Sequence, residues 1–186
     1  IPAGVIPPLT TENPSPLPLA TFLVGTGSLE SEEVVAYELG YRYYPSYRFS
    51  LDMATFYNVY SDMIAGHPGA PSIVPASTPH VEIPVTGDNG MYGKTYGVEL
   101  AADWRAMPWW RLQAAYTYLH VLLDVERGSL MVLENPDGRS PHNQFSLRSS
   151  VELTRTVELD GWLRYVGRID SLGLESYATL DLRLGW

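Results

Sequence analysis

Apolar and polar residues alternate along most of the chain after about residue 33. From residue 92 to residue 104, every second residue is apolar, aromatic or long, and the residues between them are small or charged. Residues 110–122 repeat this alternation after a tight turn at Ala106-Met107-Pro108. Because successive side chains of a β-strand point to opposite faces, each stretch predicts a strand with one apolar and one polar face. Together they predict a long hairpin.

The same alternation predicts five further strands, at about residues 33–44, 47–62, 143–155, 157–168 and 178–186. Tight turns are expected at Pro45-Ser46 and Arg155-Thr156. Long loops are expected at 64–89 and at 124–141, where Asn135-Pro136-Asp137-Gly138 is a turn signal, and a short one near 170–174. The expected fold class is therefore all-β, an antiparallel up-and-down meander of about seven long strands.

Residues 1–32 contain six prolines and show no sustained period. Proline lacks a backbone donor and restricts the residue before it, so this segment is predicted to be a long loop.

The predicted strands exceed the usual globular length of about five or six residues, and long loops alternate with tight turns. Both features are typical of a transmembrane β-barrel, whose short turns are periplasmic and whose long loops are extracellular. Charges on the apolar faces occur only near strand ends, at Glu33, Lys94, His120 and Arg155. A soluble antiparallel sheet with one wet face is the alternative, but Trp104, Trp109 and Trp110 at one turn favour an interfacial aromatic girdle.

Charged residues in the strands fall on the polar faces, which in a barrel line the lumen. The lumen-facing candidates are Glu38, Arg42, Arg48, Asp52, Glu99, Asp103, Arg111, Arg148, Glu152, Arg164, Asp181 and Arg183. Some of them could line a ligand route. The alternative is that opposite charges pair across strands in a wet lumen, at about 0.2–1 kcal/mol a pair. The residues that bind a ligand are not identified by this pattern.

The amino-acid composition limits the functions and partners that the chain can have. The 186 residues have a formal net charge of −9, which argues against a nucleic-acid partner. There is no cysteine, and no motif of a known enzyme class is present, so no catalytic residue and no cofactor is predicted. His67, His80, His120 and His142 are dispersed; His67 and His80 share one predicted loop and could meet a metal, but exposed loop histidines without such a role are the better interpretation.

Seven segments, in order, resemble the later part of the barrel of TonB-dependent outer-membrane receptors. They are EVVAYELGYR (33–42), FSLDMATFYNVYSDM (49–63), GKTYGVELAADWR (93–105), WWRLQAAYTYLH (109–120), NQFSLRSSVEL (143–153), ELDGWLRYVGRI (158–169) and SYATLDLRLGW (176–186). The resemblance implies a 22-stranded barrel that is closed by an N-terminal plug domain and powered through TonB. It also implies the outer membrane of a Gram-negative bacterium and uptake of a scarce ligand, foremost an iron–siderophore complex.

The resemblance divides the chain into an extracellular proline-rich loop (1–32) and a partial outer-membrane barrel (33–186). The plug domain, the TonB-binding segment and the closing strands of the family have no counterpart here, so we expect a piece of a longer receptor. Its partners would be outer-membrane lipid, the plug domain, TonB through the missing N-terminal part and a metal chelate. An isolated piece is expected to associate through open sheet edges. A small complete outer-membrane barrel and a soluble β-sandwich binding module are the alternatives.

Overall fold

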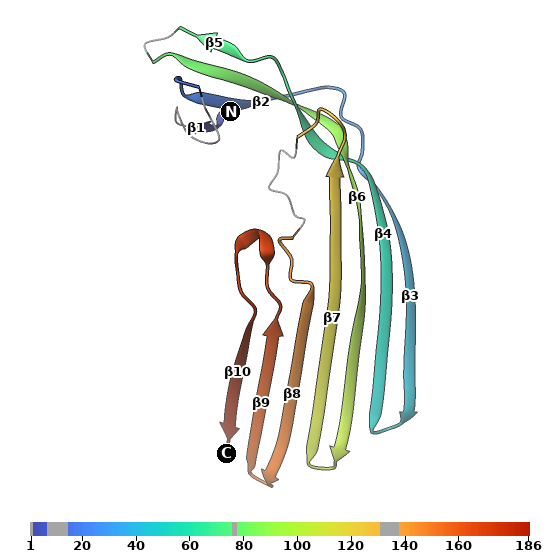
Figure 1. The fold of residues 1–186 in the computed structure, drawn as a ribbon. Helices are drawn as coiled ribbons and strands as arrows, with labels where there is room; N and C mark the ends of the chain where they lie inside the picture. Colours follow the sequence, from blue (N-terminus) through green and yellow to red (C-terminus); the bar gives the residue numbers. More distant parts are fainter. Residues whose placement is uncertain (1, 7–14, 76–77, 131–137) are drawn as a thin grey trace. The chain divides into compact units, whose positions relative to one another are not determined.

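The computed structural model describes residues 2–6, 15–75, 78–130 and 138–186. Ten strands and one short 3₁₀ helix form within these ranges. They are β1 (Pro2–Ile6), β2 (Leu19–Val24), β3 (Glu33–Ser46), β4 (Phe49–Pro68), β5 (Ser72–Val74), β6 (His80–Met107), β7 (Trp110–Val125), β8 (Asn143–Thr154), β9 (Val157–Val166), η1 (Asp170–Leu172) and β10 (Tyr177–Gly185). The all-β class is confirmed, and the seven predicted strands are β3, β4 and β6–β10 (Figure 1).

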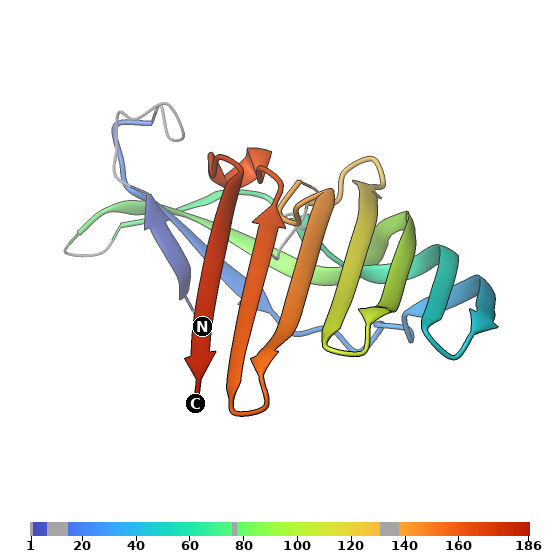
Figure 2. The same ribbon diagram turned by 90° about the horizontal axis from the view of Figure 1, so that it is seen from below.

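The chain forms two compact units, and β3, β4, β6 and β7 contribute residues to both. The first unit comprises residues 1–34, 60–93 and 123–134, and the second comprises residues 35–59, 94–122 and 135–186. We call the second unit the meander, because its strands follow one another as neighbours in one antiparallel sheet, in the order β3-β4-β6-β7-β8-β9-β10. Figure 2 shows these strands side by side in a single layer.

The meander has no buried core in the part of the chain that the structure describes. The buried hydrophobic residues are Ala65, Val85 and Met91, and all three belong to the first unit. On the apolar side of the meander, Leu39 is 73% exposed and Leu182 is 70% exposed. No second sheet covers this face within the unit, so the alternative of a β-sandwich is wrong. Among the described strands, β3 and β10 have a neighbour on one side only, so the sheet does not close as a small complete barrel requires.

The first unit corrects two loop predictions. The segment 1–32 was predicted to lack strands, but it contains β1 and β2, which pair antiparallel with each other. The predicted loop 64–89 contains the end of β4, the short β5 and the first part of β6. Leu19–Val24 pairs in parallel with residues 81–86 of β6, and β5 pairs with residues 80–82. The pairing of β2 with β6 joins segments distant in sequence, so local periodicity did not reveal it.

The tight turns lie close to their predicted positions. Arg155-Thr156 is confirmed as a turn, and the turn after β6 lies at Pro108-Trp109. Pro45-Ser46 is the end of β3, so the predicted turn there is wrong by two residues and lies at Tyr47-Arg48. The Arg48 amide donates to Ser46 Oγ at 3.3 Å, a local bond that stabilises this turn.

The turn signal Asn135-Pro136-Asp137 lies outside the described residues, and Gly138 after it has a positive φ of 72°. Residues 170–173, predicted as a short loop, contain η1. No helix in the described ranges is both long and apolar enough to cross a lipid bilayer.

Candidate functional site

The polar face of the meander carries the predicted site residues in a defined register. Arg148 of β8 is paired with Gln113 of β7 and with Trp162 of β9, and Trp162 is paired with Asp181 of β10. Directly opposed residues of neighbouring strands share a face of the sheet. The alternation predicted from the sequence therefore continues across β7, β8, β9 and β10.

Eight of the twelve predicted residues form ion pairs within the meander. The pairs are Arg42 with Asp52, Arg111 with Asp103, Arg164 with Asp181, Arg148 with Asp160, and Arg183 with both Asp160 and Glu158. Each pair is partly exposed, so each contributes at most about 1 kcal/mol to stability. The other four, for which the described residues provide no ion pair, are Glu38, Arg48, Glu99 and Glu152.

Asp160 is a central residue that was not among the sequence candidates. Its side chain is 17% exposed, the least of the carboxylates that pair with arginine on this face. It accepts a hydrogen bond from Ser150 Oγ at 2.6 Å and one from Arg183 Nη1 at 2.9 Å, and Arg148 Nη2 lies 3.6 Å away. The alternation along β9 places Asp160 beside Trp162 and would have identified it.

Trp162 is a large aromatic side chain among these charges. The Arg164 guanidinium lies 4.5 Å from the centroid of its ring, a distance typical of a cation–π contact. Trp162 also borders a hollow of about 350 Å³ that is lined by residues of β4, β6, β7, β8 and β9. The hollow brings Asp52, Asp103 and Arg148 to one part of the polar face. It offers aromatic surface and charged groups to a bound molecule or a packed segment.

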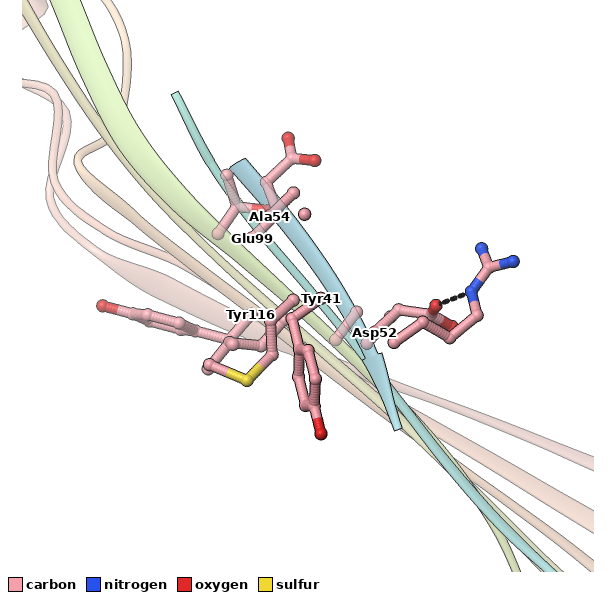
Figure 3. Close-up of a pocket in the computed structure, with 12 residues that line it drawn as sticks. Tyr41, Asp52, Ala54, Glu99 and Tyr116 are labelled. Carbon is pink, nitrogen blue, oxygen red and sulfur yellow. Dashed lines mark hydrogen bonds and ion pairs between the residues drawn. The ribbon is translucent and has the colours of Figure 1, made fainter. Parts of the chain in front are cut away.

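A wider hollow of about 560 Å³ lies over β3, β4, β6 and β7 (Figure 3). Its lining includes the small residues Gly40, Ala54, Ala101 and Ala115. Figure 3 shows the sheet nearly edge-on, with Tyr41 and Tyr116 on one side and Glu99 on the other. The lining thus includes residues from both faces, as expected for a sheet one layer thick, and this hollow is not an enclosed binding cavity.

Phe56 is an apolar residue on the polar face of β4, and the structure explains it. A Cβ atom at Gly97 would lie 2.7 Å from Phe56 Cζ, so the ring occupies the space that a side chain at residue 97 would fill. Beside it, Asn58 Nδ2 donates to Thr95 Oγ1 at 3.1 Å. The glycine is needed here because two strands and an aromatic ring converge on one point.

The first unit holds two of the dispersed histidines at strand ends instead of in one loop. His67 lies in β4, and its Nδ1 is 3.8 Å from Asp88 Oδ2. His80 begins β6; its Nδ1 contacts the Thr78 carbonyl at 2.9 Å and its Nε2 contacts Glu82 Oε1 at 3.1 Å. These two acceptors, first the carbonyl and then the carboxylate, raise the pKa of His80 above its ordinary value. No group of three or more metal-ligating side chains occurs within the described ranges.

His120 and His142 lie in the meander. Their rings stack at a centroid distance of 4.7 Å, and Tyr96 stacks on His120 at 5.1 Å. His142 Nδ1 contacts the Leu119 carbonyl at 2.9 Å. No local pattern predicts this stack, because the three rings come from β6, β7 and the residue before β8.

The fold and the two-faced meander define a segment of a large antiparallel β-barrel wall. A family model described as TonB dependent receptor-like, beta-barrel matches residues 9–186. The chain therefore belongs to the TonB-dependent receptor family, in its β-barrel part. No curated protein matches the chain.

Solved structures share this fold. The siderophore receptor PirA from Acinetobacter baumannii matches 90% of this chain at 19% identity with a TM-score of 0.67, and the match covers 27% of that receptor. The FrpB iron transporter from Neisseria meningitidis (F3-3 variant) matches 89% at 17% identity with a TM-score of 0.65, over 26% of its length. The ferric yersiniabactin uptake receptor FyuA from Yersinia pestis matches 83% at 24% identity with a TM-score of 0.55, over 22% of its length. The chain thus spans about a quarter of these receptors.

Proposed function

We propose that the chain is a wall segment of an outer-membrane receptor that imports a scarce ligand, foremost an iron–siderophore complex. The observation that carries this proposal is the family match over nearly the whole chain. The solved receptors of similar fold are named for siderophores or iron, which supports that ligand class. The charge of −9 supports the view that nucleic acid is not a partner. The receptor acts as a transporter and needs no resident cofactor.

The two faces of the meander have different partners in this proposal. The uncovered apolar face, which includes Leu39 and Leu182, contacts outer-membrane lipid of a Gram-negative bacterium. The polar face with its ion pairs lines the lumen and meets the plug domain of the same receptor. TonB acts through the N-terminal part of that receptor.

The orientation follows from the connections. The short turns at 47–48, 108–109 and 155–156 face the periplasm, and the proline-rich residues 1–32 and the long connections face outside. In this arrangement Trp104 and Trp109, both about half exposed, lie at the periplasmic boundary of the membrane.

The function is tested by uptake. A strain that lacks the receptor gene is grown under iron limitation and supplied with ⁵⁵Fe-loaded siderophores of the catecholate, hydroxamate and phenolate classes. We expect one class to accumulate only when the gene is restored, and the accumulation to stop when TonB is deleted. Equal uptake of every class with and without the gene would refute iron–siderophore import.

The orientation has its own test. The chain has no cysteine, so single cysteines can be introduced into a cysteine-free receptor. Ala70→Cys, in the connection between β4 and β5, should react with a membrane-impermeant maleimide on whole cells. Tyr47→Cys, in a short turn, should react only after the outer membrane is opened. The opposite pattern would reverse the orientation.

A further inference from the structure

The Asn89 side chain joins three separate parts of the first unit. Its Oδ1 accepts a hydrogen bond from the Glu30 amide at 2.8 Å, and its Nδ2 donates to the Glu30 carbonyl at 3.0 Å. The same Nδ2 donates to the Asp62 carbonyl in β4 at 2.5 Å. One side chain of β6 therefore binds both main-chain groups of Glu30, as a neighbouring strand would do.

These bonds fasten the connection between β2 and β3. The parallel ladder of β2 with β6 ends at Thr86, and residues 25–32, which follow β2, form no strand. We call residues 25–32 the strap. Asn89 holds the strap near its middle, and the Glu32 carboxylate accepts a hydrogen bond from the Ile64 amide at 2.9 Å near its end. Side-chain hydrogen bonds thus replace the ladder that holds β2.

Asn89 also restrains an unusual backbone conformation in β4. Among the described non-glycine residues, Asp62 alone has a positive φ, of 55°. This left-handed conformation is unfavourable for most residues and persists where the surroundings hold it. The bond from Asn89 Nδ2 to the Asp62 carbonyl is one such restraint. Loss of the Asn89 amide group would therefore loosen both the strap and this part of β4.

Asn89 is the one asparagine of the chain that precedes a glycine; the other four precede Pro14, Val59, Pro136 and Gln144. The backbone nitrogen of the following residue can attack the asparagine Cγ, which forms a cyclic succinimide and releases ammonia. Water then opens the succinimide at either carbonyl and gives aspartate or isoaspartate. Glycine favours the attack because it has no side chain to hinder it, and proline prevents it because its nitrogen carries no hydrogen.

The native structure restrains both groups that take part in this reaction. The Gly90 amide donates to Asp88 Oδ1 at 3.1 Å, and the Gly90 carbonyl accepts from the Glu126 amide at 2.7 Å. Gly90 is buried, and a Cβ atom there would collide with Ser129 Oγ. The Asn89 amide group is held by its bonds to the strap and to β4. The attack therefore requires local opening of this segment.

We propose that Asn89 is a deamidation site and that its conversion releases the strap irreversibly. The product carries an oxygen in place of the Nδ2 donor, and this carboxylate faces the carbonyl oxygens of Glu30 and Asp62. Three acceptors cannot bond to one another, so both Nδ2 bonds are lost. An isoaspartate also adds one carbon to the main chain of β6. A transient opening of the strap is thereby made permanent.

The test uses the whole receptor, purified in detergent and aged at mildly alkaline pH, with the products at Asn89 measured by peptide mapping and mass spectrometry. Because opening must precede the attack, the folded receptor should convert Asn89 about 10–100-fold more slowly than the same chain unfolded in urea. Asn58 and Asn143, which precede larger residues, are internal controls and should remain unconverted over the same period.

A pair of variants tests the restraint on the attacking nitrogen. Asp88→Ala removes the acceptor of the Gly90 amide, so the folded rate, divided by the urea-unfolded rate of the same variant, should rise about tenfold. The matched control Asp88→Asn keeps a side-chain oxygen as acceptor and should stay close to the parent.

Release of the strap is measured by hydrogen exchange. In Asn89→Asp, amides of residues 25–32 should exchange faster than in the parent, while those of β10 should not change. If this variant does not fold, the aged receptor supplies the same comparison. The proposal is overturned by equal folded and unfolded rates, by unchanged exchange of the strap after conversion, or by no product at Asn89 within about a hundred unfolded half-times.

Discussion

Two adjacent alanines in the part of β7 that pairs with β8 give the most direct test of the two faces. Ala114 is paired with Leu147 on the apolar face, and Ala115 is paired with Ser146 on the polar face. The variants Ala114→Arg and Ala115→Arg introduce the same side chain, one residue apart, on opposite sides of one strand. If the apolar face meets lipid, only the first variant places a charge in hydrocarbon.

The expected magnitude follows from the position of Ala114. The pairing of β7 with β8 runs from Trp110 to Tyr118, so Ala114 is four residues from either end. With a rise of about 3.4 Å per residue and a strand tilt of about 40°, it lies roughly 10 Å from each end along the membrane normal, near the middle of an apolar band about 25 Å tall. Arginine at that depth costs about 2–4 kcal/mol. At Ala115, which is exposed and paired with Ser146 on the polar face, we expect a cost below about 1 kcal/mol.

The assay is urea unfolding of the whole receptor refolded into phosphatidylcholine vesicles, followed by tryptophan fluorescence. Ala114→Arg should lower the urea midpoint or prevent insertion, while Ala115→Arg should remain close to the parent. The leucine variants of both alanines control for side-chain size, and Ala114→Leu should be tolerated. Equal losses for the two arginine variants, or a larger loss at Ala115, would refute the assignment of the faces.

Two further predictions concern the crowded strands and the first unit. Gly97→Ala should lower the free energy of unfolding by about 1–3 kcal/mol, because its methyl group would meet a backbone carbonyl and an aromatic ring. The control Gly161→Ala, whose added methyl group would have its nearest atom at an ordinary 3.5 Å, should cost less than about 1 kcal/mol in the same urea assay. Equal losses for the two variants would contradict the crowding at Gly97. In an NMR titration, His80 should show a pKa above about 6.5, and Glu82→Gln should reduce the shift while the bond to the Thr78 carbonyl remains. Because the His80 pKa is raised in the folded state, the stabilisation of the fold by protonated His80 is present at low pH and is lost as the pH rises through the folded pKa. A His80 pKa at or below the ordinary value would refute this prediction.

The sequence was a good guide to the meander because its strands are strictly two-faced. A shift of one residue would move charges such as Glu99 and Asp181 to the apolar side, so the register is strongly specified. The same alternation identified eight residues that form ion pairs. On the same side the structure places Trp162 against Arg164.

Other features had no local signal. The strand β2 is six residues long and lies in a proline-rich segment, and it pairs with β6 some sixty residues later in the chain. The alternation along β9 does place Asp160 on the charged side, but only the structure shows that Ser150, Arg148 and Arg183 converge on it.

The amino-acid sequence by itself determined the strand periodicity, the two chemically different faces and the likeness to a TonB-dependent receptor barrel. The periodicity and the two faces follow from the period of two along each strand of the meander, and the likeness rests on the seven segments that resemble that family. The tertiary structure alone decided that β2 pairs in parallel with β6 and which charges neutralise one another. Those properties depend on contacts between residues far apart in the chain, and alternation within one strand is the same whichever strand lies beside it.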